Sequence, residues 1–340
     1  MRRSNRASGK VEHGEGRLHP IIKVGTRAHF PDPQMTMNLN PLGSTDSVAG
    51  DKSNAQPAPG VRTDSRPTPL LWLTVLSLDA PVVAVLWQLL FARSFNARLA
   101  PPITILLALV VWLVYVADRV LDALKAPPRG AEAARHTFYR RHLWTFLFPL
   151  FIGFGIAAWM SLTQLDAKTF RHGLIILLFV GIYLLLVHLI SPGREWLPKE
   201  MLVGVLFALG TCFPVWERTT GNTAALAAPY LLFTALCWMN CAAIEHEEWT
   251  RLRGRRFDLP HAWTIWIGRH FMLLSLVIAA ICFGLMVSGF ERSHWQLLAA
   301  ELLSAIAFAS IRRKMESFSV DQFRVVVDVA LFTPLLFLPF

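Results

Sequence analysis

The sequence predicts an all-α protein, a polytopic membrane helical bundle with about nine transmembrane helices. Of its 340 residues 54% are hydrophobic and only 16% are charged, which is more apolar surface than a soluble core of ordinary composition can bury. From residue 69 onward the apolar stretches reach the roughly 20 residues that an α-helix needs to cross a hydrocarbon layer about 30 Å thick. Proline, glycine or charged residues separate these stretches. Most of the chain is therefore expected to lie in a lipid bilayer.

The chain divides into two parts of different composition. Residues 1–66 form a basic, polar N-terminal segment without sustained apolar periodicity. Disorder is predicted for this segment, because it buries too little surface to offset its conformational entropy. Residues 67–340 form the predicted transmembrane domain. Its expected helices span residues 69–92, 101–121, 143–163, 172–190, 200–217, 223–246, 268–289, 294–311 and 323–340.

Lysine and arginine are distributed unevenly between the two sides of this predicted bundle. Fifteen lie in or beside the loops on one side and six on the other, and the cytoplasmic side of a membrane protein carries the excess. The basic N-terminal segment falls on the richer side, so we expect a cytoplasmic N-terminus in a bacterial inner membrane. The formal charge of +10 does not indicate a nucleic-acid partner, because the basic residues sit in short runs between apolar stretches.

Two aspartates end the second apolar stretch, in the sequence WLVYVADRVLDALK. Asp118 and Asp122 are four residues apart and so lie on one helical face, a turn from each other. Such a pair is suited to a divalent cation such as Mg²⁺, which uses oxygen ligands and keeps one or two protein carboxylates beside water and substrate phosphate. The alternative is an ordinary polar helix end that meets water.

Two glutamates end the sixth apolar stretch, on the same predicted side of the membrane. Glu245 and Glu248 are three residues apart, and Asn240 precedes them by about one turn. An amphipathic helix exit, in which these acids pair with the basic RLRGRR run that follows, is the alternative interpretation. Because two acidic pairs end on one side, we expect one composite site for a metal-bridged diphosphate, with Lys and Arg offsetting the residual charge.

The placement of these pairs resembles the UbiA superfamily of intramembrane prenyltransferases, whose members have nine helices and acidic motifs after the second and sixth. The family's first motif is NDxxDxxxD; YVADRVLD supplies its last two aspartates, while Val114 and Tyr115 stand where the family has Asn and Asp. Glu245 and Glu248 stand in for the second motif. The resemblance extends over roughly residues 69–340.

A further similarity lies before the fifth apolar stretch, in LPKEMLVGVLFALGT. Lys199 and Gly204 match a family segment in which a lysine precedes a helix containing an LG pair. After the first motif, APPRGAEAARHTFYRRHLW differs from the family's usual Arg-Pro-Leu continuation. The closest subfamilies therefore do not define the acceptor.

The resemblance implies that residues 67–340 move a prenyl group from a polyprenyl diphosphate to an aromatic or lipid acceptor soluble in the membrane, with Mg²⁺ as cofactor. It implies one Mg²⁺ on Asp118 and Asp122, a second on Glu245 and Glu248, and Asn240 orienting metal or water. The residues expected to approach the diphosphate are Arg119, Lys199 and Arg255. Those expected to line the prenyl cavity are Tyr115, Trp112 and Trp238, with helix packing or interface anchoring as the alternative role.

Other features of the sequence leave different functions open. Asp79 and Asp328 lie inside apolar stretches, where an ionisable side chain is costly and marks either a functional site or a structural one. His188 is expected to be a buried hydrogen-bonding residue. The four cysteines form no CxxC pair, which favours packing over zinc or disulfides. The alternatives to an enzyme are a non-catalytic lipid-binding or partner-binding protein on the same scaffold, and a cation-coupled transporter.

Overall fold

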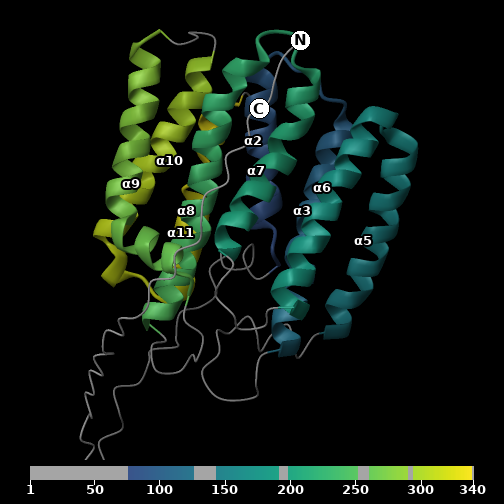
Figure 1. The fold of residues 1–340 in the computed structure, drawn as a ribbon, viewed down its shortest axis with the longest axis horizontal. Coiled ribbons are helices and arrows are strands. Elements are labelled where there is room, and N and C mark those ends of the chain that lie inside the picture. The colour runs from purple at the N-terminus through teal and green to yellow at the C-terminus, as the bar shows by residue number, and fades with distance from the viewer. Residues whose placement is uncertain (1–75, 126–142, 191–197, 252–259, 290–293, 339–340) are drawn as a thin grey trace, which may run out of the picture. The chain divides into compact units, whose positions relative to one another are not determined.

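The computed structural model describes residues 76–125, 143–190, 198–251, 260–289 and 294–338 (Figure 1). Over these ranges the protein is all-helical and contains no β-strand. The α-helices are α2 (Asp79–Ser94), α3 (Pro101–Lys125), α5 (Leu143–Gln164), α6 (Ala167–Leu185), α7 (Lys199–Arg218), α8 (Ala227–Arg251), α9 (Ala262–Val287), α10 (Trp295–Arg313) and α11 (Val320–Val329). A π-helical turn, Leu186–Ile190, extends α6. The predicted disordered segment, residues 1–66, lies outside the described residues.

Seven helical segments in the described ranges are long and apolar enough to cross a membrane. They are Pro101–Leu121, Leu147–Gln164, Ala167–His188, Lys199–Arg218, Thr223–Arg251, Ala262–Val287 and Trp295–Arg313. These segments confirm the prediction of a multi-pass helical membrane protein. They do not confirm the predicted number of about nine transmembrane helices. The first and last expected spans correspond to shorter helices, since α2 has 16 residues and α11 has 10.

The last expected span, residues 323–340, is not one continuous helix. Helix α11 ends at Val329, and after a turn the chain forms a short 3₁₀ helix, Thr333–Leu336. Pro334 explains the change, because proline lacks a backbone N–H and disfavours the α conformation in the residue before it. The indole Nε1 of Trp87 donates a hydrogen bond of 2.9 Å to the Leu331 carbonyl at this break. A backbone acceptor that the helix leaves free is thus satisfied inside the bundle.

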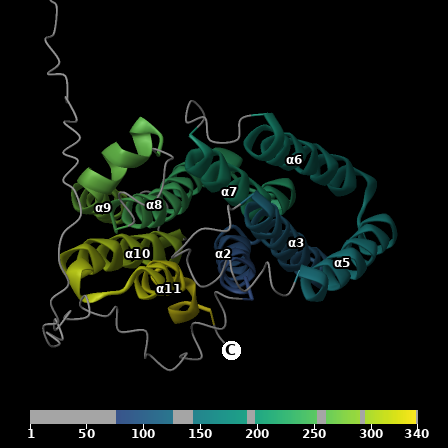
Figure 2. The same cartoon turned by 90° about the horizontal axis from the view of Figure 1, so that it is seen from below.

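Successive helices alternate in direction and pack against their neighbours. Helix α9 contacts α10 and α8, α7 contacts α8 and α6, and α2 contacts α3 and α7. Viewed from below, α2 and α7 lie between α3, α5 and α6 on one side and α8 to α11 on the other (Figure 2). Only 6% of the α6 span is buried, compared with 50% of the α8 span. Helix α6 therefore presents most of its apolar surface to lipid, while α8 is central.

The centre of the bundle is a tightly packed aromatic and aliphatic core. Trp87 and Phe91 of α2 and Phe233 of α8 are fully buried, and the Trp87 and Phe233 rings stack with 4.5 Å between centroids. Helices α7 and α8 approach closely at Gly204, where an added Cβ would lie 2.7 Å from the backbone nitrogen of Trp238. Glycine is required at this contact because the neighbouring atom belongs to the backbone.

We expected the fourth span to begin at residue 172, but helix α6 begins five residues earlier, at Ala167. Asp166 caps its N-terminus and accepts the backbone N–H of Thr169 at 2.9 Å. Arg218 at the end of α7 donates to the same carboxylate at 2.8 Å. The Thr169 N–H is the main cause that holds the pKa of Asp166 below its usual value.

Candidate functional site

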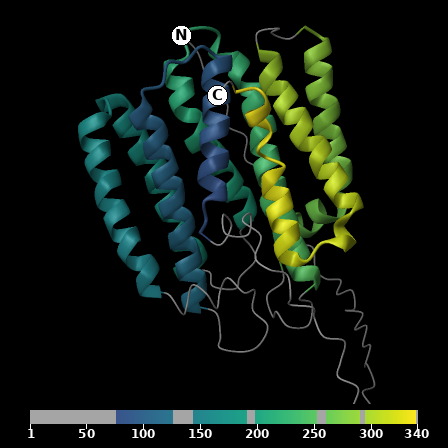
Figure 3. The same cartoon turned by 180° about the vertical axis from the view of Figure 1, so that it is seen from behind.

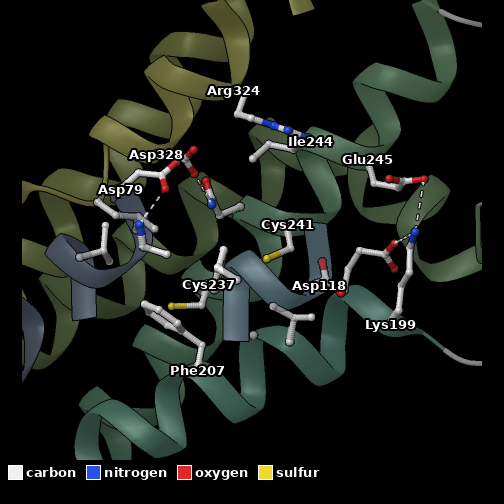
Figure 4. A pocket seen from close by; sticks show the side chains of 18 of the residues that line it. Asp79, Asp118, Lys199, Phe207, Cys237, Cys241, Ile244, Glu245, Arg324 and Asp328 are labelled. Atoms are coloured by element: carbon white, nitrogen blue, oxygen red, sulfur yellow. Dashed lines mark hydrogen bonds and ion pairs between the residues drawn. The ribbon is translucent and has the colours of Figure 1, made fainter. Parts of the chain in front are cut away.

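A cavity of about 220 Å³ lies among helices α2, α3, α6, α7, α8 and α11 (Figure 4). Its lining residues include Asp118 and Glu245, toward the ends of α3 and α8, and Lys199, the first residue of α7. Figure 3 shows that these helix ends lie at the same end of the bundle. Its polar lining residues are Asp79, Tyr115, Asp118, Arg119, Tyr183, Lys199, Glu200, Asn240, Glu245, Arg324 and Asp328. Charged groups are thus concentrated in one cavity of an otherwise apolar bundle.

The α3 sector of this cavity carries an acid and a base next to each other. The Oδ1 atom of Asp118 lies 2.9 Å from Nε2 of His188, in the π-helical turn after α6. The His188 side chain is almost fully buried, whereas that of Asp118 is 36% exposed and faces the cavity. Arg119 follows directly, and its Nη1 atom is buried without a hydrogen-bond partner. This sector therefore offers an oriented carboxylate and an unsatisfied guanidinium donor.

A second sector is centred on the ammonium group of Lys199, the first residue of α7. Its Nζ atom lies 3.7 Å from Oε1 of Glu245 on α8 and 3.8 Å from Oε1 of Glu200 (Figure 4). Glu200 is buried and also accepts a 2.8 Å hydrogen bond from the Thr264 hydroxyl of α9. One positive charge thus lies between two carboxylates. This arrangement holds the ammonium group at the cavity wall.

Glu248, one turn after Glu245, has a different environment. Its Oε1 atom accepts a hydrogen bond from Nη2 of Arg324 on α11, and both side chains are buried. Arg324 lines the cavity, but Glu248 does not. The ion pair joins α8 to α11 and balances the buried charge on both sides.

The third sector contains two acids from distant parts of the sequence. Asp79 begins α2 and Asp328 lies in α11, and their carboxyl groups lie next to each other at the cavity (Figure 4). Asn240 of α8 donates from Nδ2 to Oδ1 of Asp328 at 2.9 Å, while its own Oδ1 atom has no hydrogen-bond partner. The backbone N–H of Ala80 donates to Oδ1 of Asp79 at 2.9 Å. In Figure 4 this sector lies on the opposite side of the cavity from Lys199 and Glu245.

Apolar and aromatic side chains form the rest of the lining. Tyr115 meets Phe207 edge-on, with 6.4 Å between ring centroids. Val83, Val203 and Leu331 complete this surface. The cavity is therefore amphipathic, with charged groups in three sectors and an apolar wall between them.

The structure brings six of the expected site residues together at this cavity. They are Tyr115, Asp118, Arg119, Lys199, Asn240 and Glu245. Trp112 and Trp238 are not among the lining residues; the Trp112 indole donates to the Leu76 carbonyl, and Trp238 packs against the core beside Gly204. Arg255 and the side chain of Asp122 fall outside the part of the chain that the structure describes.

Some site residues are apparent only in three dimensions. His188 was expected to make a buried hydrogen bond, and its partner proves to be the acidic residue Asp118. Asp79 and Asp328 were each notable as acids in apolar stretches, but nothing in the sequence linked them to each other. Glu200 was not identified at all, although a glutamate at the start of an apolar helix is the same type of signal.

The donor set of the cavity fits a cation that binds together with an anionic ligand. Among the described side chains, no group of three or more His, Cys, Asp or Glu residues forms a metal site by itself. The cavity nevertheless has five carboxyl groups and three basic groups, so acidic side chains outnumber basic ones. Mg²⁺ uses few protein carboxylates and completes its shell with water and phosphate oxygens. Asp118 and Glu245 could therefore hold Mg²⁺ that accompanies a phosphate-bearing ligand.

The fold and the cavity define a multi-pass integral membrane protein with a charge-rich, amphipathic cavity near one end of its bundle. Comparisons with protein-family models, with curated proteins and with solved structures found no match. Its function must therefore follow from the chemistry of the cavity.

Proposed function

We propose that the protein is a UbiA-like integral membrane prenyltransferase that moves a prenyl group from a polyprenyl diphosphate to an aromatic or lipid acceptor with Mg²⁺. The observation that carries the proposal is the buried Nη1 atom of Arg119, which has no hydrogen-bond partner and belongs to a residue that lines a cavity with more acidic than basic side chains. An unsatisfied buried guanidinium donor is costly, and a diphosphate oxygen would satisfy it. Mg²⁺ bound to the diphosphate would offset the repulsion between this anion and the acidic side chains of the cavity.

Different side chains would bind the diphosphate and the Mg²⁺ that accompanies it. Arg119 and Lys199 would bind its oxygens, and Asp118 and Glu245 would hold Mg²⁺. The chemistry that Mg²⁺ supplies when bound is withdrawal of electron density from the diphosphate, which weakens the allylic C–O bond. Further ligation by Asp122 and Glu248, and a contact from Arg255, remain predictions from the sequence. Glu248 would have to leave Arg324 to take part.

The apolar wall of the cavity is suited to the allylic end of the prenyl group. Tyr115 and Phe207 present aromatic surface that stabilises positive charge developing on the allylic carbon, and the surrounding apolar side chains exclude water. A volume of about 220 Å³ is below the roughly 300–1,000 Å³ of pockets for drug-sized ligands. The cavity thus suits the diphosphate and the first prenyl carbons, and the remaining tail would extend into lipid.

The proposed orientation places this site where its substrates are available. Asp118 and Glu245 of the cavity come shortly before two of the more basic loop sequences, which we predict to be cytoplasmic. A cytoplasmic N-terminus in a bacterial inner membrane would give Mg²⁺ and the diphosphate group access from the cytoplasm. The prenyl tail and the acceptor would reach the same cavity from the bilayer.

Purified protein in detergent tests the proposal directly. Labelled polyprenyl diphosphates of several chain lengths are incubated with a membrane extract as the source of acceptor, with and without Mg²⁺. We expect Mg²⁺-dependent release of diphosphate and a labelled lipid product, both of which Asp118→Asn and Glu245→Gln abolish. Asp321→Asn, at an exposed position at the start of α11, is the matched control. Absence of metal-dependent release at every chain length would exclude the enzyme.

A non-catalytic lipid-binding protein on the same scaffold is the second candidate. The observation that favours it is the internal pairing of the second acidic cluster, since Glu245 lies beside Lys199 and Glu248 is bonded to Arg324. Such a protein would bind a prenyl diphosphate equally well with Mg²⁺ or with a chelator and would return it unchanged. Equilibrium binding of the intact label under both conditions separates this candidate from the enzyme.

A further inference from the structure

The sector formed by Asp79 and Asp328 has no role in holding the diphosphate. The two residues are 249 positions apart in the sequence, yet their carboxyl groups lie next to each other at the cavity (Figure 4). Two carboxylates at this separation cannot both carry a charge at low cost, because their repulsion in a poorly solvated site is strong. A pair of adjacent carboxyl groups is therefore suited to taking up a single proton, which then belongs to the pair rather than to either residue.

Asn240 supplies an independent sign that this sector meets a ligand. Its side chain is 9% exposed and donates from Nδ2 to Asp328, which orients the amide. Asn240 lines the cavity, and its buried Oδ1 atom has no hydrogen-bond partner, although a buried acceptor of this kind normally has one. A hydrogen-bond donor from a molecule in the cavity would complete the amide. Asp79, Asp328 and Asn240 thus bring acceptor groups to one sector of the cavity.

Groups from three helices surround the pair. From α3, Tyr115 interacts electrostatically with both acids and Arg119 interacts with Asp328. From α8, the Cys241 thiol lies near Asp328, and on α11 itself Arg324 is engaged by Glu248. One basic group, Arg119, thus acts on an acid pair that lies in the cavity wall.

We propose that the Asp79–Asp328 pair is the proton acceptor of the cavity, taking up the proton that the acceptor molecule loses when it is prenylated. The inference rests on the proposed function. In the transfer, the allylic C–O bond breaks and its electron pair leaves with the diphosphate, while a new bond forms between the allylic carbon and a nucleophilic atom of the acceptor. The proton on that atom passes to the charged member of the pair, then to water when the products leave. Asn240 positions Asp328 and is a positioning residue.

The test follows the two halves of the reaction separately in Asp79→Asn and Asp328→Asn. Diphosphate release reports on ionisation, and labelled lipid product reports on capture by the acceptor. We expect product formation to fall about 100- to 10,000-fold, as for loss of a general base, with diphosphate release changed less than about 10-fold because water captures the prenyl group instead. Asp328→Glu, which retains the carboxyl group, is expected to restore part of the product.

Infrared spectra of the same proteins report on the shared proton without any need for turnover. The wild type is expected to show a protonated carboxyl band that shifts in ²H₂O and is lost in both Asn variants. Glu301→Gln is the matched control, because Glu301 is a fully buried acid of α10 that does not line the cavity. It should remove a different carboxyl signal and leave product formation intact.

The outcomes separate the two proposals. If wild-type protein is active but both Asn variants lose diphosphate release and product equally, or if the shared band survives them, the proton-acceptor role is wrong and the prenyltransferase stands. If wild-type protein releases no diphosphate with Mg²⁺, the prenyltransferase is wrong and the role of the pair falls with it. If both Asn variants lose the lipid product but keep diphosphate release, and the protonated carboxyl band is also lost, the results support both the prenyltransferase and the proton-acceptor role of the pair.

Discussion

His188 and Asp118 are hydrogen bonded across the interface between α6 and α3, with 2.9 Å between Nε2 and Oδ1. The imidazole is almost fully buried and sits in a π-helical turn, a feature that is frequent at functional sites. A partner that is fixed by packing restricts the rotamers of this carboxylate, which lines the cavity. Histidine thus orients the group to which we assign Mg²⁺ binding.

The first prediction concerns this orienting contact. We expect His188→Ala to reduce Mg²⁺-dependent diphosphate release about 10- to 100-fold, the usual effect of removing a partner of a metal ligand. Asp118→Asn should have the larger effect. Rates are measured over a Mg²⁺ titration, so that weaker metal binding appears as a higher Mg²⁺ requirement. His270→Ala, on α9 and outside the cavity lining, should leave the titration unchanged.

The second prediction concerns Arg119. Replacement by alanine removes the buried guanidinium, and we expect Mg²⁺-diphosphate to bind about 10- to 100-fold more weakly, in line with the roughly 1.5–3 kcal/mol of a charged hydrogen bond. Arg119→Lys should recover part of the affinity through charge alone. Binding of inorganic diphosphate with Mg²⁺ is measured by calorimetry. Arg98→Ala, at an exposed position outside the cavity, provides the comparison, and equal affinities in all three variants would contradict the role of Arg119.

The helical membrane fold was accessible from the sequence because lipid imposes a simple rule on segment length and polarity. The expected spans 101–121 and 200–217 closely match α3 and α7. The last expected span was wrong as a single helix, because hydropathy registers the apolar residues of 323–340 and not the effect of Pro334 on the backbone. Helix ends set by one side chain, such as the cap at Asp166, were also missed.

The candidate site could be predicted only in part from the sequence. Asp118 and Glu245 stood out because acids are rare in apolar stretches, and both line the cavity. Spacing within one helix suggested that Glu248 would act with Glu245, but side chains one turn apart can point to different neighbours, and Glu248 points to Arg324. The pairing of Asp79 with Asp328 depends on how α11 packs against α2 and α8, which no local pattern encodes.

The third prediction uses two glycines of α7 with opposite surroundings. At Gly204 an added Cβ would lie 2.7 Å from the Trp238 backbone nitrogen, so Gly204→Ala must separate α7 from α8 and deform the cavity wall. At Gly210 no atom lies within 4 Å of the added Cβ. We expect a lower melting temperature in detergent and weaker ligand binding for Gly204→Ala. Gly210→Ala should be neutral or stabilising by up to about 1 kcal/mol. Equal effects of the two changes would contradict the close packing.

The fourth prediction separates the structural and metal-binding roles of Glu248. Arg324→Met removes the guanidinium that is hydrogen bonded to the buried Glu248 carboxylate and is expected to cost about 3–5 kcal/mol of unfolding free energy. Adding Glu248→Gln removes the charge of that carboxylate, so the double variant should recover most of the loss, which unfolding titrations in mixed micelles measure. Because the Mg²⁺ assignment uses Asp118 and Glu245, the double variant should also retain metal-dependent diphosphate release. A stable double variant without that release would instead make Glu248 a metal ligand, as its spacing from Glu245 suggests.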